Sequence, residues 1–505
     1  MRKIFSAAFV FILLFSPSIN AQPAFLKDSL DTYIARILEQ WNIPGMAICV
    51  VKDGKVEVMK GYGVRDVATK APVTDETLFM IASNSKAFTG TALAILDGEN
   101  RISLDDKVTK WMPDFKLYDA YSTKEVTIRD LLCHRIGLET FQGDFLNWGS
   151  NLSRKQVIDK MRLHKPAYPF RYTYGYCNAA FLTAGEIIPL ATDTSWDDFL
   201  KYRFFAPLKM TRTSTTYNGI TTDANAAIPY TLFKRKLVKL AYPDLGNLGP
   251  AASINSCIKD LSHWITALLA NGMYDGNQVI PRKAILLTRT PQMLVNHLSQ
   301  NFPSTHFSAY GLGWELSDFA GRKMISHSGG ADGFVTAVCL IPEEKLGIVV
   351  LTNSDANYMY DGVKRQIIDA YLDQPYRDYN AIYYSSFEKN TTAEIDQFSK
   401  LEDKVEANNK SKFEIASLAG KYENEVYGLM EIKIEKKQPV MYFEHHSALK
   451  GYLKYEGDNK FLCTYSSSMY GEKEIPFTME GNVVKSCSVS VNDFIDYKVY
   501  EFVKK

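Results

Sequence analysis

The chain has 505 residues, with 58 lysine and arginine residues against 57 aspartate and glutamate residues, giving a formal net charge of +1. Its 46% hydrophobic content can fill a large core, and its length predicts roughly two to four domains. The basic residues form no run, so the sequence lacks the electrostatic footprint of a nucleic-acid-binding protein. We therefore expect the partner to be a small molecule or a short peptide, and the oligomeric state is left open.

The first 21 residues have the pattern of a secretory signal peptide. Arg2 and Lys3 precede an uncharged stretch over residues 4–15, and Ala21 is a small residue at the expected cleavage position. The apolar stretch is shorter than the roughly 18–20 residues that cross a membrane. We expect an exported mature chain that begins near Gln22, has no membrane span and resides in the bacterial periplasm.

The seven cysteines are spread along the chain without the spacing of metal ligands. We therefore expect no metal site, and we expect no cofactor. Since their number is odd, at least one must stay unpaired within the monomer. Cys463 and Cys487 are the one pair that we consider for a disulfide.

The next segments predict a sheet and a buried helix. Residues 45–52 and 55–60 alternate like strands around Asp53-Gly54, a two-residue hairpin signal. Residues 86–97 are apolar and rich in alanine, which favours a buried helix. Helical segments then alternate with loops to about residue 290, and residues 333–352 indicate a second hairpin. We predict an α+β fold in which helices flank a sheet and a helical lobe is inserted.

The last part of the chain changes character twice. Residues 376–411 are polar and charged, which favours a linker that is partly helical, and residues 412–505 return to short alternating runs typical of a small all-β domain. The predicted organisation is a signal peptide at 1–21, a main domain at 22–375, a linker at 376–411 and a β domain at 412–505. We expect the main domain to act without the β domain.

Ser83 and Lys86 form a Ser-x-x-Lys motif at the start of the predicted buried helix. A nucleophilic serine needs a base and a group that stabilises the oxyanion. The N-terminal end of the helix favours negative charge, and Lys86 lies one turn along the same face, where burial would lower its pKa. The motif alone also fits a helix cap beside a surface lysine, and it recurs at Ser256/Lys259, Ser386/Lys389 and Ser447/Lys450.

Two further motifs follow in the chain. In Tyr176-Cys177-Asn178 the first and third side chains point the same way, so the phenol and the amide would face one cavity. The glycines of the segment His327-Ser328-Gly329-Gly330 let the backbone approach a ligand closely. The alternatives are a core tyrosine with a helix-capping asparagine, and a glycine-rich loop with an incidental histidine.

Together, these motifs resemble the serine β-lactamase and penicillin-binding-protein superfamily, specifically its class C-like branch. The resemblance covers about residues 30–375 and includes the segments 131–138, 310–314 and 346–353. Residues 418–428 resemble a β domain of unknown function that is often appended to such proteins. Where relatives often have Pro-Ala-Gly-Gly, this chain has Pro-Ala-Ala-Ser at residues 250–253. Whether this loop contributes to the site is therefore an open question.

The resemblance implies a β-lactamase/transpeptidase-like sheet and a role for each motif. Ser83 would be the nucleophile, with Lys86 and Tyr176 as general bases. Asn178 would position Lys86, and the backbone N–H groups of Ser83 and Gly330 would form the oxyanion hole. The expected substrate-binding or positioning residues are Asn178, His327, Ser328, Gly329 and Gly330.

We therefore expect a secreted serine hydrolase that forms an acyl-enzyme on Ser83. The family implies D-residue amides or peptides, such as peptidoglycan fragments, or small esters as substrates, as in D-aminopeptidases, D-Ala-D-Ala carboxypeptidases and esterases. The alternatives are a class C-like β-lactamase and a non-catalytic penicillin- or peptide-binding protein.

His327 stands where many β-lactamases carry the lysine of Lys-Thr-Gly. Because a histidine with a pKa of about 6.5 is mostly neutral at pH 7, we expect weak anchoring of a substrate carboxylate that improves as the pH falls toward 6. Arg135 and Arg171 are the alternative cations.

Overall fold

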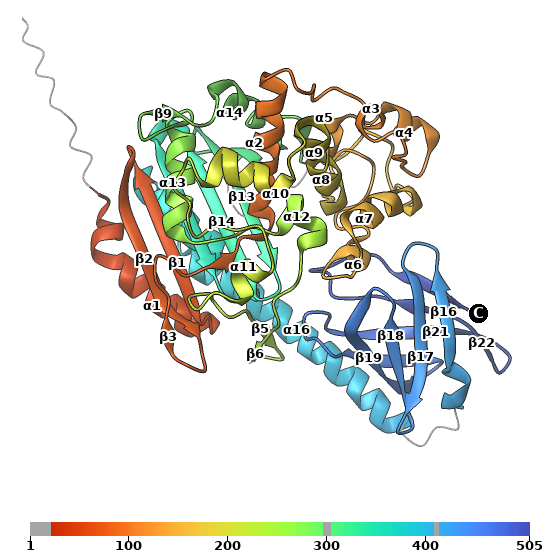
Figure 1. Ribbon diagram of the computed structural model, residues 1–505. Coiled ribbons are helices and arrows are strands. Elements are labelled where there is room, and N and C mark those ends of the chain that lie inside the picture. Colours follow the sequence, from red (N-terminus) through yellow and green to blue (C-terminus); the bar gives the residue numbers. More distant parts are fainter. Residues whose placement is uncertain (1–21, 296–304, 409–413) are drawn as a thin grey trace, which may run out of the picture.

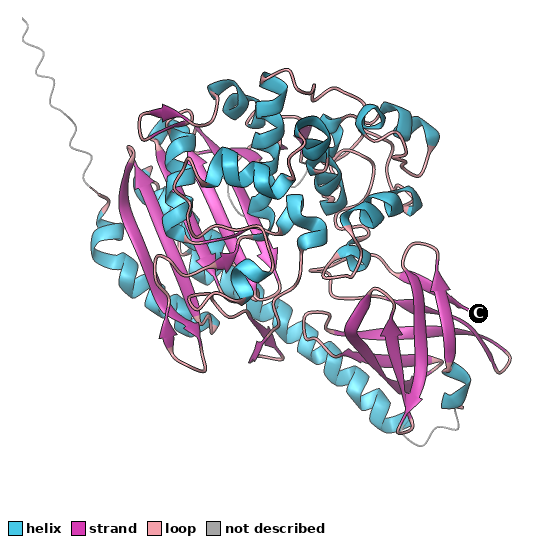
Figure 2. Cartoon of the chain, in the orientation of Figure 1, coloured by secondary structure: helices cyan, strands magenta, loops and turns pink. Residues whose placement is uncertain are grey.

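A computed structural model describes residues 22–295, 305–408 and 414–505 (Figure 1). The predicted signal peptide lies outside these residues. Figure 2 shows a larger body of helices around a sheet and a smaller body made almost entirely of strands, with one long helix running to it. No helix in the described part of the chain is long and apolar enough to cross a membrane.

The larger body is built on a nine-stranded sheet of antiparallel neighbours, in the order β10-β11-β12-β13-β14-β15-β1-β2-β3. The predicted hairpins are present, because β1 pairs with β2 around Asp53-Gly54 and β14 pairs with β15. The strands are β1 (Gly45–Lys52), β2 (Lys55–Asp66), β3 (Ala71–Pro72), β10 (Met293–Leu294), β11 (Ser308–Tyr310), β12 (Glu315–Phe319), β13 (Arg322–Ala331), β14 (Phe334–Ile341) and β15 (Leu346–Thr352).

Helices cover both faces of this sheet. Alternate residues of β1 divide between two cores: Ala47 and Cys49 pack with α2 (Ser85–Gly98) and α13 (Ile258–Leu269). Met46 and Ile48 pack with α1 (Leu30–Trp41) and α15 (Met359–Tyr371). Since successive side chains of a strand point to opposite faces, the complete burial of β1 is what a sheet covered on both sides requires.

Short helices form the inserted lobe, which lies to one side of the sheet in Figure 1. They are α3 (Val108–Trp111), α4 (Ala120–Glu125), α5 (Ile128–Leu132), α6 (Asp144–Asn147), α7 (Arg154–Lys160), α8 (Asn178–Gly185), α9 (Ile187–Thr192) and α10 (Trp196–Leu200). The segment after them holds α11 (Asn218–Thr221), α12 (Gly249–Ala252) and α14 (Arg282–Thr288), with the strand pairs β5 (Tyr230–Phe233) and β6 (Lys236–Lys239), and β8 (Met273–Tyr274) and β9 (Asn277–Gln278). It also holds β7 (Asn255–Ser256), which pairs with β4 (Phe79–Met80), a short strand that precedes α2.

The smaller body is a closed eight-stranded barrel. The helix α16 (Tyr379–Asn408) occupies most of the segment predicted as a linker and packs on α15 and on β19. The predicted fold class is thus confirmed. All seven cysteines are buried free thiols, so Cys463 and Cys487 form no disulfide. The barrel strands are β16 (Gly420–Asn424), β17 (Gly428–Glu435), β18 (Gln438–Phe443), β19 (His446–Gly457), β20 (Lys460–Tyr465), β21 (Glu472–Glu480), β22 (Val483–Val489) and β23 (Tyr500–Lys504).

Candidate active site

Ser83 lies in a single 3₁₀ turn, η2 (Ala82–Asn84), that continues directly into α2. Ala82 is buried and has a φ of 47°, a left-handed conformation that residues other than glycine rarely adopt. The turn packs against β13 so closely that a Cβ at Gly329 would lie 2.1 Å from the carbonyl oxygen of Ile81. Gly329 therefore lets the turn approach the strand, which brings Ser83 beside the end of β13.

Lys86 is fully buried behind Ser83. Its Nζ donates hydrogen bonds to Ser83 Oγ (3.2 Å), to Asn178 Oδ1 (2.6 Å) and to the carbonyl oxygen of Ala251 (3.0 Å). Burial lowers the pKa of Lys86 to about 7, against the opposing effect of Asp144. The neutral amine, which can accept a proton from Ser83, is therefore accessible near neutral pH. Ala251 lies in the segment where the chain departs from Pro-Ala-Gly-Gly, so this loop binds the lysine through its backbone.

Tyr176 packs over the same lysine, with Lys86 Nζ 4.5 Å from the centre of the phenol ring. The ring is held between His134 (centroids 4.3 Å apart) and Phe141 (5.5 Å). Burial raises the pKa of Tyr176 well above its usual value, while a hydrogen bond with Ser83 lowers it in part. At neutral pH the phenol therefore keeps its proton, which suits a proton relay better than a resting phenolate base.

Asp144, which the sequence did not single out, fixes the orientation of Asn178. The Nδ2 of Asn178 donates to Asp144 Oδ2 at 2.6 Å, while its Oδ1 accepts from Lys86. Asp144 is the first residue of α6 and is buried, and burial together with the nearby Asp496 raises the pKa of its carboxyl well above the usual value. A chain of hydrogen bonds thus runs from Asp144 through Asn178 to Lys86 and Ser83.

We predict that Asp144→Ala slows the reaction of Ser83 with a fluorophosphonate by roughly tenfold, the equivalent of one buried hydrogen bond. Without its acceptor, the Asn178 amide is free to rotate away from Lys86. The measurement is the single-turnover labelling rate. Asp144→Asn is the matched control, because it keeps an acceptor oxygen and should retain most of the rate. Equal rates in the alanine variant and the unaltered protein would remove Asp144 from this chain of contacts.

His327 is buried in β13 with both ring nitrogens engaged. Nδ1 donates to the carbonyl oxygen of Ser328 (2.6 Å), so Nε2 accepts from the hydroxyl of Tyr310 (2.8 Å). Burial and the charge of Lys86 lower the pKa of His327 to about 3. The expectation that carboxylate binding improves as the pH falls toward 6 is therefore wrong, because the ring takes up no proton in that range.

The residues that follow His327 form an open strand edge. In the described part of the sheet, β12 pairs with β13 only from Arg322 to Ser326, whereas β14 pairs as far as Ala331. One edge of the segment 327–331 is thus unpaired, and its backbone N–H and C=O groups on that side are available to a ligand. Ser328, Gly329 and Gly330 all line the same cavity as Ser83.

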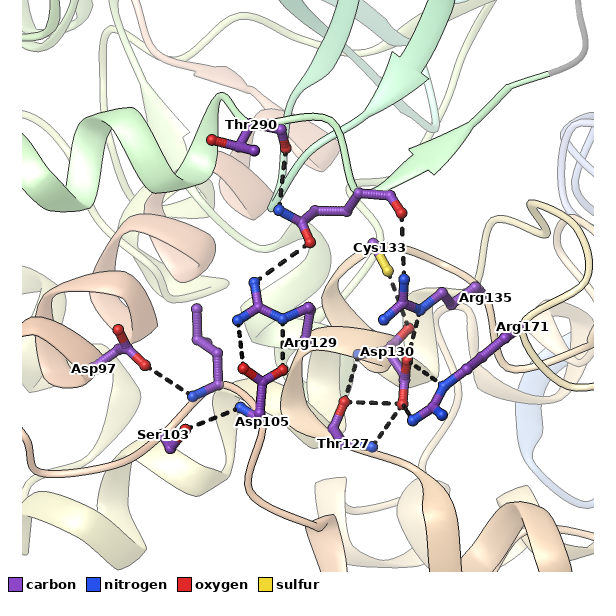
Figure 3. A network of polar contacts seen from close by, with 12 residues as sticks. Asp97, Ser103, Asp105, Thr127, Arg129, Asp130, Cys133, Arg135, Arg171 and Thr290 are labelled. Carbon is purple, nitrogen blue, oxygen red and sulfur yellow. Dashed lines mark hydrogen bonds and ion pairs between the residues drawn. The ribbon is translucent and has the colours of Figure 1, made fainter.

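Arg135 and Arg171, considered above as alternative cations for a substrate carboxylate, stabilise the lobe instead. Figure 3 shows Arg135 and Arg171 converging on Asp130, a fully buried carboxylate, each with an N–O distance of 2.6 Å. The backbone N–H and the hydroxyl of Thr127 bind the same carboxylate. Neither arginine lines the cavity around Ser83, so neither is placed to bind a substrate carboxylate.

A cavity of about 880 Å³ is lined by all of the predicted site residues except Lys86, which lies buried behind Ser83. The cations in its described lining are Lys234 and Arg235; Lys234 is ion-paired with Glu402 and Glu472, and Arg235 with Glu388. The described lining also carries acidic side chains and no unpaired lysine or arginine, so it offers no free cation to an anionic substrate. Among residues 22–295, 305–408 and 414–505, no group of three His, Cys, Asp or Glu side chains is arranged to hold a metal ion. The acidic lining residues are Asp144, Glu315, Asp355, Glu388, Glu394 and Asp493.

The cavity is not a feature of the larger body alone. Its lining includes Phe387 and Ile395 of α16, and Met469, Phe494 and Tyr497 of the barrel. The expectation that the main domain acts without the β domain stays a prediction, and the barrel residues in the lining are the reason to test it by truncation. No motif in residues 412–505 marks this contact, so the sequence alone did not predict it.

Comparisons with known proteins agree with this geometry. Residues 30–373 match the family described as Beta-lactamase. A protein named flp from Staphylococcus aureus is 31% identical over 340 residues, covering 66% of this chain, and the chain spans 64% of that protein's length. An unguisins hydrolase from Aspergillus campestris is 30% identical over 367 residues, or 68% of this chain and 66% of that protein.

The fold also matches a solved structure over nearly its whole length. The octameric penicillin-binding protein homologue from Pyrococcus abyssi superposes with a TM-score of 0.61 at 21% identity, covering 94% of this chain and 99% of that chain. At this identity the match concerns the fold alone.

Proposed function

The chain belongs to the β-lactamase family of serine hydrolases, and from this premise we propose that it hydrolyses amides or esters through an acyl-enzyme on Ser83. The observation that carries the proposal is the hydrogen bond from Lys86 to Ser83 Oγ, made by a buried amine with a pKa of about 7. The proposed substrates are peptides or amides with D-residues and small esters, in forms without a free carboxylate beside the scissile bond.

The steps follow from the contacts around Ser83. Ser83 Oγ attacks the carbonyl carbon of the substrate as its proton passes to neutral Lys86. The backbone N–H groups of Ser83 and Gly330 stabilise the oxyanion. Tyr176 relays the proton to the nitrogen or oxygen of the leaving group as its bond to the carbonyl carbon breaks. Water then attacks the acyl-enzyme, gives its proton to the same groups and releases Ser83.

Further observations support parts of this proposal. One relative is named as a hydrolase of unguisins, which supports hydrolysis as the chemistry of the family. The pattern of residues 1–21 supports export, and we propose the bacterial periplasm as the location. A class C-like β-lactamase is the rival that needs a direct test, by turnover of a penicillin and a cephalosporin.

The proposed preference predicts how a substrate carboxylate affects turnover. We expect kcat/KM to be about tenfold or more higher for the C-terminal amide of N-acetyl-D-alanyl-D-alanine than for its free acid. The reason is that the described lining offers no unpaired cation, and tenfold corresponds to roughly 1.4 kcal/mol. Because the pKa of His327 is about 3, the ring takes up no proton between pH 5.5 and 8 and adds no pH dependence of its own to this ratio. A strong preference for the free acid would overturn this expectation.

A further inference from the structure

Two barrel segments reach the cavity, residues 468–471 and the segment 490–499, which joins β22 to β23 and is called the barrel loop below. A buried carboxylate anchors it. Asp496 is 1% exposed, and its Oδ2 accepts hydrogen bonds from the backbone N–H groups of Gly143 and Phe145, both at 3.1 Å. The same oxygen accepts a hydrogen bond from the hydroxyl of Tyr500 at 2.6 Å.

This anchor ties the loop to the turn that carries Asp144. Gly143 and Phe145 flank Asp144, whose carboxylate orients Asn178. A second contact holds the loop nearby, because the ring of Tyr497 stacks on Phe141 (centroids 5.7 Å apart, planes at 28°). Buried hydrogen bonds and ring stacking of this kind are costly to break, so the loop has a defined position beside the site.

Phe494 lies at the tip of this loop, against Gly330. A Cβ at Gly330 would come within 2.9 Å of the Phe494 ring, whereas a Cβ at Gly329 would meet Ile81 of the Ser83 turn. The two glycines of β13 therefore contact the nucleophile turn on one face and the barrel on the other. Phe494 is 37% exposed and lines the cavity together with Ser83 and Gly330.

We propose that Phe494 is a specificity-determining residue, through which the C-terminal barrel supplies an apolar wall of the acyl-group subsite and favours short apolar acyl groups. The proposal rests on the proposed function. Ser83, Gly330 and Phe494 line one cavity, and the Phe494 ring lies against Gly330, the proposed oxyanion donor. An acyl group on Ser83 whose oxygen binds the Gly330 N–H therefore lies close to this ring. The ring offers apolar contact to a small substituent. Because it lies directly on Gly330, it leaves a long chain no path between them.

The test is the chain-length preference of the full-length protein toward p-nitrophenyl esters. For Phe494→Ala, we expect the ratio of kcat/KM for octanoate to that for acetate to rise at least tenfold, because the wall is gone. Phe494→Trp should lower the ratio. The matched control is Tyr442→Ala, a barrel aromatic on β18 that does not line the cavity, and it should leave the ratio unchanged.

Labelling with a fluorophosphonate distinguishes a failure of the role of Phe494 from a failure of the proposed function. Suppose that Ser83 is labelled in the unaltered protein and in both Phe494 variants. If the octanoate-to-acetate ratio of both variants then stays within twofold of that of the unaltered protein, the role of Phe494 is overturned and the proposed function stands. If the unaltered protein is neither labelled nor active on any ester, the proposed function fails, and the wall fails with it. If Phe494→Ala does not fold, the result for Phe494→Trp decides.

Discussion

Replacing Ser83 with alanine should abolish labelling by a fluorophosphonate and lower ester turnover by about 10⁴-fold or more, the scale seen when a nucleophilic serine is removed. The fold should persist. Lys86 would keep its hydrogen bonds to Asn178 and Ala251, so the loss of the Ser83 hydroxyl leaves no buried amine without a partner. Intact-protein mass spectrometry gives the probe stoichiometry, and thermal melting reports the fold.

A matched control exists within the chain. Ser447 opens another Ser-x-x-Lys pattern, in the barrel, and it is exposed. Ser447→Ala should therefore leave both labelling and turnover unchanged. Labelling that persists in Ser83→Ala, or that maps to Ser256 or Ser447, would contradict the assignment of Ser83 as the nucleophile.

The four Ser-x-x-Lys patterns show how far the sequence leads. Lys86 precedes an apolar helical run, which predicted burial, and it is 0% exposed. Lys259 instead lies near the surface and is paired with Glu76 at 2.6 Å. The hairpin around Asp53-Gly54 and the alternating strands of the barrel were equally predictable. In each case a local pattern carries the information, so neighbouring residues in the chain are enough.

The parts that the sequence did not predict depend on contacts between distant residues. Asp144 meets Asn178 34 residues away, and Asp496 meets Gly143 353 residues away. Neither contact leaves a spacing signal. The polar composition of residues 376–411 favoured a linker that is partly helical, but it did not predict that one helix, α16, with few buried side chains, spans Tyr379–Asn408 and bridges two bodies. Such a helix has no wide apolar stripe, and periodicity alone does not separate it from a loop.

Replacing Lys86 with alanine should slow acylation by roughly 10²–10⁴, the usual contribution of a general base. Lys86 is the proposed acceptor of the Ser83 proton, and only its neutral form accepts. Because its pKa is lowered to about 7, acylation by the unaltered protein should rise with pH through about 7 and fall as the amine becomes charged below that value. The measurement is the rate of the p-nitrophenol burst between pH 5.5 and 8.5.

Two further variants make this test specific to proton transfer. Lys86→Arg keeps a cation but cannot release its proton in this range, so it should be as slow as the alanine variant and should lose the rise near pH 7. Lys389→Ala, from the exposed Ser386/Lys389 pattern on α16, should retain both the rate and the pH profile. A fast arginine variant with an unchanged rise would show that another group, with Tyr176 the nearest candidate, accepts the Ser83 proton.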